Sequence, residues 1–159
     1  MIATYDESSS TLFLPDKSMR RVSVTGCRDA LNGYQQGRCF YCSAPITLLQ
    51  GDAQADVDHF FPHLLRRTNL GAAVNGIWNL VLACWACNRG PSGKFARVPA
   101  RHLLERLHVR NEFLIGSHHP LRETLIQQTG RTTLTRQAYL TAFDRAAHSN
   151  LIHRWQPAH

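Results

Sequence analysis

The order of hydrophobic and polar positions predicts two short strands in the middle of the chain. Residues 55–60 alternate between apolar and polar side chains, as in a half-buried strand, and Pro62 ends the run. In residues 79–83 an asparagine is followed by four consecutive apolar residues, which predicts a second short strand. The stretch between them, residues 64–77, is rich in Asn and Gly and predicts a long polar loop.

Helical spacing appears on both sides of these strands. Residues 25–36 repeat apolar side chains along one helical face, and Gly37 stands where a helix C-terminus favours glycine. A shorter helix is expected to begin near Trp85 and to break at the turn formed by residues 90–93, which contains glycine and proline. Residues 1–18 carry few periodic apolar positions and predict either a loose arm or an edge strand.

The last third of the chain predicts three more helices. Pro99 suits the first position of a helix that runs to about Leu114. Residues 119–130 predict the next helix, and residues 133–155 a third, which Pro157 ends. We expect their apolar stripes to form core contacts.

Together these elements predict an α+β fold in three parts. An N-terminal arm and helix occupy residues 1–37, and a small core of two strands and a helix occupies residues 38–98. A helical C-terminal extension occupies residues 99–159.

Composition and charge predict where the protein is located and what class of partner it binds. No apolar run approaches the ~20 residues of a membrane span, and the N-terminus lacks the basic start and apolar stretch of a signal peptide, so we expect a soluble cytoplasmic protein. The formal net charge is +7, which suits a polyanion such as nucleic acid. The positive charge comes from 16 Arg and from only Lys17 and Lys94. Charge alone leaves open a basic protein without such a partner.

The cysteines predict a metal site. Cys39 and Cys42 form one C-x-x-C pair, and Cys84 and Cys87 form another. Two such pairs in a chain without secretory features favour a structural site in which four thiolates bind zinc. A redox dithiol or unrelated buried cysteines are the alternatives. Cys27 stands apart and is interpreted as a small buried hydrophobic residue.

A further set of residues resembles the HNH, or His-Me finger, nuclease family. The strings are residues 57–62 (Val-Asp-His-Phe-Phe-Pro), residues 79–84 (Asn-Leu-Val-Leu-Ala-Cys) and residues 87–88 (Cys-Asn). The resemblance covers about residues 38 to 94, and the final motif position is Asn rather than His. It implies a ββα-metal core and a metal-dependent endonuclease that hydrolyses phosphodiester bonds, most readily in double-stranded DNA. It also suggests a role in bacterial defence or restriction. The C-terminal helices could brace the core, bind DNA, dimerise or dock to an ATPase or helicase subunit.

The resemblance assigns roles that the chemistry of the residues supports. His59, the side chain of the motif that titrates near neutral pH, is the expected general base. Asp58 and Asn88 offer hard oxygen ligands to a catalytic Mg²⁺ or Mn²⁺. Asn79 is expected to orient the His59 ring.

Plainer roles stay open for each of these residues. His59 is alternatively a surface histidine, Asp58 a salt-bridge partner, Asn88 a helix N-cap, and Asn79 a residue that holds the loop. Because Asp58 and His59 are adjacent on a strand, a regular strand points them to opposite faces, and only a twist or bulge brings them together.

Several side chains near the motif are candidate phosphate contacts. Arg66 and Arg67 fall in the predicted loop together with His63, and Arg89 and Lys94 follow the last motif residue. They are alternatively plain solvated side chains. The competing function is a zinc-stabilised module that binds nucleic acid without cleaving it, and a third possibility is an interaction domain whose C-terminal helices dock on a partner.

Overall fold

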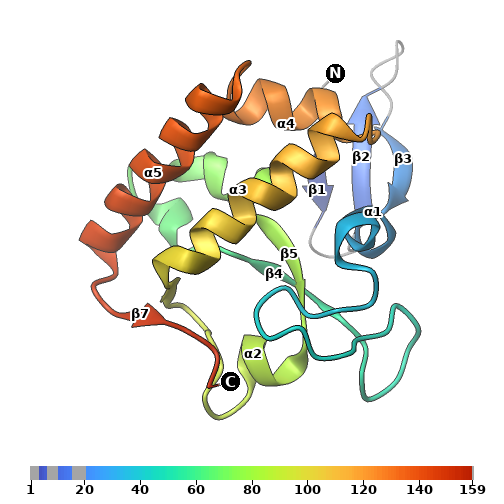
Figure 1. Cartoon of the computed structure of the whole chain (residues 1–159), viewed down its shortest axis with the longest axis vertical. Helices are drawn as coiled ribbons and strands as arrows, with labels where there is room; N and C mark the ends of the chain where they lie inside the picture. The colour runs from blue at the N-terminus through green and yellow to red at the C-terminus, as the bar shows by residue number, and fades with distance from the viewer. Residues whose placement is uncertain (1–3, 7–10, 16–20, 159) are drawn as a thin grey trace.

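The computed structural model describes residues 4–6, 11–15 and 21–158 and shows a small mixed α/β protein (Figure 1). Short strands, one helix and three 3-10 turns make up its first half, and helices dominate its second. In chain order the elements are β1 (Thr4–Asp6), β2 (Thr11–Pro15), β3 (Arg21–Gly26), α1 (Cys27–Gln35), β4 (Asp56–His59), the 3-10 helices η1 (His63–Arg67), η2 (Gly71–Asn75) and η3 (Ile77–Asn79), β5 (Leu80–Ala83), α2 (Trp85–Arg89), β6 (Val98–Pro99), α3 (Arg101–Gly116), α4 (Arg122–Thr129), α5 (Thr133–Asn150) and β7 (Arg154–Trp155).

The central unit is the antiparallel pair of β4 and β5, followed directly by α2. Asp56 lies opposite Ala83, and His59 lies opposite Leu80. All residues of β5 are buried, which fits its unbroken apolar run. The two predicted strands and the short helix after them are therefore present.

The segment between these strands is not the polar loop that its composition predicts. It forms η1, η2 and η3, and it buries Leu65, Val74 and Ile77. Short 3-10 turns satisfy backbone groups locally, so a stretch rich in Asn and Gly can still direct a few apolar side chains into the core.

The N-terminal segment pairs more extensively than expected. Strands β1, β2 and β3 form an antiparallel sheet in that order, with β2 in the middle. The predicted edge strand is present as β1, which pairs with β2 at the side of the sheet. The alternative prediction, a loose arm, is wrong for β2, because this strand pairs with β1 and with β3. The side chain of Cys27 lies outside the described residues.

The boundaries of the C-terminal helices differ from the sequence prediction, and α4 begins at Arg122 rather than near residue 119. Pro99 does not start α3 but lies in β6, which pairs in parallel with β7 through Pro99 and Trp155. Helix α5 ends at Asn150, so Trp155 is not helical. Its indole is buried and its carbonyl oxygen accepts the N–H of Ala100 at 2.7 Å. We infer that the chain turns back after α5 because burial of the Trp155 indole stabilises the protein more than further helical turns would.

Helix α3 braces the central unit. It contacts α1, α4 and α5 and runs diagonally across the molecule in Figure 1. From α3, Arg106 Nη1 donates to the carbonyl oxygens of Phe40 at 2.7 Å and Tyr41 at 3.1 Å. One turn later, the fully buried Arg110 donates to the carbonyl oxygens of Leu80 at 2.7 Å and Trp78 at 3.1 Å.

An aromatic cluster joins α5 to this unit. The Trp78 ring lies 4.7 Å from that of Phe143, which lies 5.0 Å from that of Phe61. The indole also covers Gly76, where an added Cβ would come within 2.4 Å of it. No helix in the described part of the chain combines the length and apolarity that crossing a membrane requires.

We predict that Arg110→Met destabilises the protein by about 2–3 kcal/mol, because two buried carbonyl oxygens lose a charged donor. Chemical denaturation measures the change. The matched control is Arg122→Met on the exposed side of α4, with an expected effect within about 0.5 kcal/mol. Equal stability of the two variants would contradict the bracing role of α3.

Candidate functional site

Four cysteines form one cluster. The Sγ atoms of Cys39, Cys42, Cys84 and Cys87 all lie within 4.8 Å of one another. The Cys42 and Cys84 sulfurs are 3.8 Å apart. In a tetrahedral site with Zn–S bonds of about 2.3 Å, neighbouring sulfurs are separated by about 3.8 Å. The cluster can therefore hold a zinc ion, as the sequence predicts.

The backbone around the cluster stabilises thiolates. The N–H of Cys84 donates to the sulfur of Cys39 at 3.3 Å, and that of Cys87 to the sulfur of Cys84 at 3.4 Å. A hydrogen bond from the Cys87 thiol, against the effect of burial, lowers the pKa of Cys39 to about 5. Burial raises the pKa of Cys84 to about 11. The hydrogen bond to Cys39 and burial raise the pKa of Cys87 as well, so Cys84 and Cys87 both retain protons that a metal ion must displace to bind.

The first cysteine pair is attached directly to β5. The N–H of Phe40 donates to the carbonyl oxygen of Leu82 at 2.9 Å. The buried Gln35 side chain pairs with the same residue: its Nε2 donates to the Leu82 oxygen at 2.8 Å, and its Oε1 accepts the Leu82 N–H at 2.8 Å. The end of α1 and the first C-x-x-C turn therefore act as an extra strand edge beside β5.

His59, at the end of β4, faces the 3-10 segment. Its Nε2 lies 3.2 Å from Oδ1 of Asn75, and its ring centroid lies 5.0 Å from that of His63. Tyr5 of β1 approaches the imidazole edge-on at 6.3 Å between ring centroids. The imidazole is nearly covered, with 8% of its residue surface exposed.

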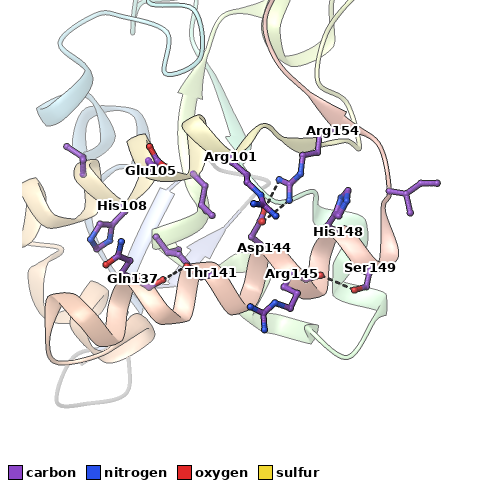
Figure 2. Close-up of a pocket in the computed structure, with 14 residues that line it drawn as sticks. Arg101, Glu105, His108, Gln137, Thr141, Asp144, Arg145, His148, Ser149 and Arg154 are labelled. Atoms are coloured by element: carbon purple, nitrogen blue, oxygen red, sulfur yellow. Dashed lines mark hydrogen bonds and ion pairs between the residues drawn. The ribbon is translucent and has the colours of Figure 1, made fainter.

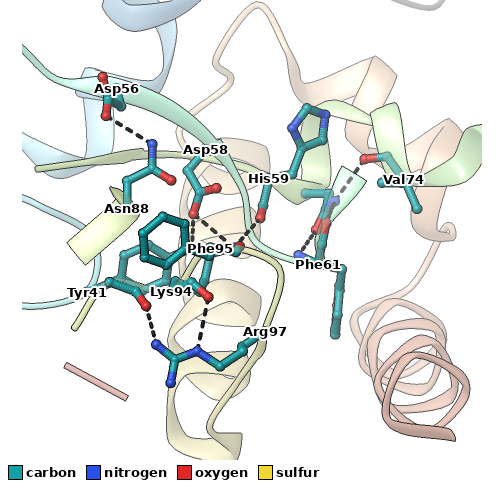
Figure 3. A network of polar contacts seen from close by, with 12 residues as sticks. Tyr41, Asp56, Asp58, His59, Phe61, Val74, Asn88, Lys94, Phe95 and Arg97 are labelled. Carbon is teal, nitrogen blue, oxygen red and sulfur yellow. Dashed lines mark hydrogen bonds and ion pairs between the residues drawn. The ribbon is translucent and has the colours of Figure 1, made fainter. Parts of the chain in front are cut away.

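Asp58, one residue earlier, faces the other side of β4 (Figure 3). The Tyr41 hydroxyl donates to its Oδ2 at 2.6 Å, and Lys94 Nζ lies 3.3 Å from the same oxygen. Burial raises the pKa of the Asp58 carboxyl, while the Lys94 charge and the Tyr41 hydrogen bond oppose that rise. The adjacent pair is thus divided between two faces, as a regular strand requires.

Asn88 lies on the Asp58 side. Its Nδ2 donates to Oδ2 of Asp56 at 3.0 Å, and Asp56 shares a face of β4 with Asp58 because the two are separated by two positions. Asp56 also forms an ion pair with Arg89, whose Nε lies 3.1 Å from its Oδ2. Asp56 therefore fixes the carboxamide of Asn88 on the face of β4 that also carries Asp58.

Asn79 holds the backbone rather than the His59 ring. It is fully buried, and its Oδ1 accepts the N–H of Phe61 at 2.8 Å. Its Nδ2 donates to the carbonyl oxygens of Phe61 at 3.0 Å and Val74 at 2.8 Å. Among the described contacts, the amide that meets the His59 ring is Asn75, which the sequence indicated only as a loop residue.

Lys94 is not a surface cation, contrary to its place among the predicted phosphate contacts. Its side chain is fully buried, and besides Asp58 it reaches the carbonyl oxygen of His59 at 2.9 Å. The turn 90–93 folds the chain back tightly enough to place it there, since a Cβ on Gly90 would come within 2.8 Å of the Ala86 backbone. Burial lowers the pKa of Lys94, and the Asp58 carboxylate opposes that change.

The remaining predicted phosphate contacts do lie at the surface. Arg66 and Arg67 are exposed on η1, the element that also carries His63, so they flank the His59 side. Arg89 is exposed on the Asn88 side. Positive charge thus lies on both faces of β4, with Arg66 and Arg67 near His59 at its end and Arg89 beside Asp56 at its first residue.

Sequence reasoning missed the part played by Tyr41. It lies inside the first C-x-x-C pair, and no local pattern indicates that its hydroxyl reaches Asp58 across the fold.

A cavity of about 620 Å³ lies elsewhere, between α3 and α5 (Figure 2). The bidentate ion pair of Arg154 with Asp144 crosses its wall, at 2.9 and 2.8 Å. Its lining contains none of the predicted site residues, so this cavity is separate from the β4 site.

Comparisons with protein-family models, curated proteins and solved structures found no match to the chain.

We predict that the purified protein holds one zinc ion per chain and unfolds when a chelator removes it. Structural zinc contributes about 10–16 kcal/mol of binding free energy in small domains. Metal analysis and circular dichroism during chelation measure both effects. Cys84→Ser should lose the zinc, whereas Cys27→Ser should retain it, because Cys27 belongs to neither pair. Full zinc content in Cys84→Ser would contradict the assignment.

We also predict that Lys94→Met costs about 3–5 kcal/mol of stability, because it leaves the buried Asp58 carboxylate without its cation. The double variant Asp58→Asn/Lys94→Met should lose clearly less than the sum of the single changes. Denaturation of the four proteins gives the coupling. The exposed pair offers a control: Arg89→Met, which removes the partner of Asp56, should cost at most about 1 kcal/mol. Additive losses at Asp58 and Lys94 would show that the pair is not coupled.

Proposed function

We propose that the chain is a metal-dependent endonuclease of the HNH kind, which hydrolyses phosphodiester bonds in DNA. The observation that carries the proposal is the continuous order of β4, β5 and α2, with His59 at the end of the first strand and Asn88 in the helix. The four-cysteine cluster, at the junction of β5 and α2, supports the same reading. A role in restriction or defence rests on the sequence resemblance alone, and a partner ATPase or helicase rests only on the C-terminal helices.

The residues fit a divalent cation by the chemistry of their donors. The Asp58 carboxylate and the Asn88 carboxamide offer hard oxygen atoms on one side of β4, as Mg²⁺ and Mn²⁺ prefer. Two protein ligands leave positions for water and for phosphate oxygens. When bound, the cation offsets the charge that develops on the phosphate and on the leaving oxygen.

In the proposed reaction, His59 is the general base. Its ring nitrogen takes a proton from water, the water oxygen bonds to phosphorus, and the bond from phosphorus to the 3′ oxygen breaks, so that the 3′ oxygen leaves and takes a proton from solvent. Asn75 supports this role, because its amide oxygen at 3.2 Å from Nε2 fixes the orientation of the ring. Arg66, Arg67 and His63 are then the groups that meet the phosphate backbone on this side.

The opposite orientation of Asp58 and His59 sets a requirement on this proposal. A phosphate that meets both side chains must lie across the end of β4, with Asp58 released from Lys94 or the strand end twisted. The buried ion pair also favours a second candidate function, a zinc-stabilised module that binds nucleic acid without cutting it. In that case the pair of Asp58 and Lys94 is only structural.

We predict that the protein nicks or linearises plasmid DNA with Mg²⁺ or Mn²⁺, and that His59→Ala lowers the rate by about 10²–10⁴-fold, as loss of a general base does. Gel analysis of timed digests measures the rate. The matched control is His153→Ala, an exposed histidine, which should cut like the parent.

Both variants should retain zinc and a folded spectrum. Equal cutting by His59→Ala and the parent would exclude the assigned base. Salt-dependent binding without cleavage under any of these conditions would favour the second candidate.

A further inference from the structure

Two exposed aromatic side chains lie on either side of Asn88. Trp85 has 52% of its surface exposed and Phe95 has 56%, although large aromatic residues usually gain stability by burial. Trp85 stands three and four positions before Asn88 and Arg89 in α2, so these side chains share one helical face. From the other direction, the N–H of Phe95 donates to the carbonyl oxygen of Asn88 at 3.0 Å.

Phe95 is held in a strained and fixed backbone position. Its φ angle is +48°, in the left-handed region that is unfavourable for a bulky side chain. Its carbonyl oxygen accepts a hydrogen bond from Lys94 Nζ at 3.2 Å, which together with the bond to Asn88 fixes the residue at both ends. Since more than half of the side chain is exposed, packing does not compensate for the strain. A strained residue that packing does not explain points to a binding role.

Positive charge accompanies the two rings. The Arg89 side chain is 60% exposed, and its ion pair with Asp56 holds it one turn after Trp85. Aromatic rings interleaved with guanidinium groups are the usual means of holding unpaired bases and their phosphates. A base within a duplex is already stacked on its neighbours, so exposed rings gain little from intact double-stranded DNA.

We propose that Trp85 and Phe95 stack against unpaired nucleobases, so that the chain engages single-stranded or locally opened nucleic acid beside Asn88. This inference deepens the proposed function, since it specifies the substrate class of that site. The stacking itself requires no cleavage.

The test is binding of a labelled oligothymidine of about 12 nucleotides, a length within the site sizes of single-strand-binding domains. Binding is measured without Mg²⁺ or Mn²⁺, so cleavage plays no part. The chain has three tryptophans, and Trp78 and Trp155 are only 1% and 4% exposed, so quenching of tryptophan emission by the oligonucleotide reports on Trp85. An RNA oligouridine of equal length, and a duplex of equal length, distinguish the kind of strand.

Trp85→Ala and Phe95→Gly should each weaken oligothymidine binding by about 5- to 150-fold, the range expected for the loss of one stacked base. Phe95→Gly should keep or raise the thermal midpoint, because glycine adopts a positive φ without strain. The control Phe113→Ala removes an aromatic side chain, 47% exposed, from α3 and should bind like the parent. Binding to the duplex should change less than binding to the single strand.

Parent-like binding by both Trp85→Ala and Phe95→Gly would overturn the proposal. So would an equal loss in Phe113→Ala, or a Phe95→Gly variant whose weaker binding accompanies a lower thermal midpoint. The result is independent of the nuclease assignment. If the parent cuts plasmid but these variants bind oligothymidine normally, only the stacking role fails. If the variants lose binding but the parent never cuts, only the nuclease role fails.

Discussion

Four sulfur atoms within 4.8 Å of one another are the constraint on which the rest of the site depends. They join the turn after α1 to the junction of β5 and α2. A two-stranded sheet as short as β4 and β5 is at best marginally stable alone in water. The cluster gives it a third edge, because it fixes Phe40 beside Leu82 and brings the hydroxyl of Tyr41 to Asp58. Metal binding and the orientation of Asp58 are therefore parts of one structure.

The C-terminal helices complete this arrangement from the outside. Arg106 and Arg110 of α3 donate to carbonyl oxygens of the first cysteine turn and of β5. The Trp155 indole donates to the Ser92 oxygen at 2.8 Å and so fixes the turn that delivers Lys94 beneath Asp58. Several positively charged side chains thus donate hydrogen bonds to carbonyl oxygens within the protein. The number of arginines therefore overstates the charge available to the proposed nucleic-acid partner, for which the exposed groups beside β4 are the relevant ones.

What the sequence could predict were the features set by local pattern. Alternation indicated β4, and the C-x-x-C spacing indicated the metal cluster, because both depend on neighbours along the chain. The local pattern predicts that Pro99 and Trp155 are helical. Their pairing with each other across distant segments makes both of them parts of strands instead. The roles of Asn75 and Asn79 were not distinguishable, since only the folded 3-10 segment shows which amide meets the His59 ring. The sequence predicts Lys94 at the surface, but the turn closed by Gly90 and Gly93 reverses the chain and buries its side chain.

The division of Asp58 and His59 between two faces of β4 links the proposed chemistry to the proposed substrate. A strand that carries an oxygen ligand on one face and a base on the next residue can serve one phosphate more readily if the substrate bends around the strand end, in addition to the release of Asp58 or the twist of the strand that the proposed reaction requires. Duplex DNA resists such bending over a few base pairs, because its persistence length is about 150 base pairs. A single strand or an opened duplex bends easily, and its free bases can stack on rings such as those of Trp85 and Phe95. The same geometry that opposes a rigid duplex therefore favours a flexible strand, held on the Asn88 side by stacking while its phosphate reaches across to His59.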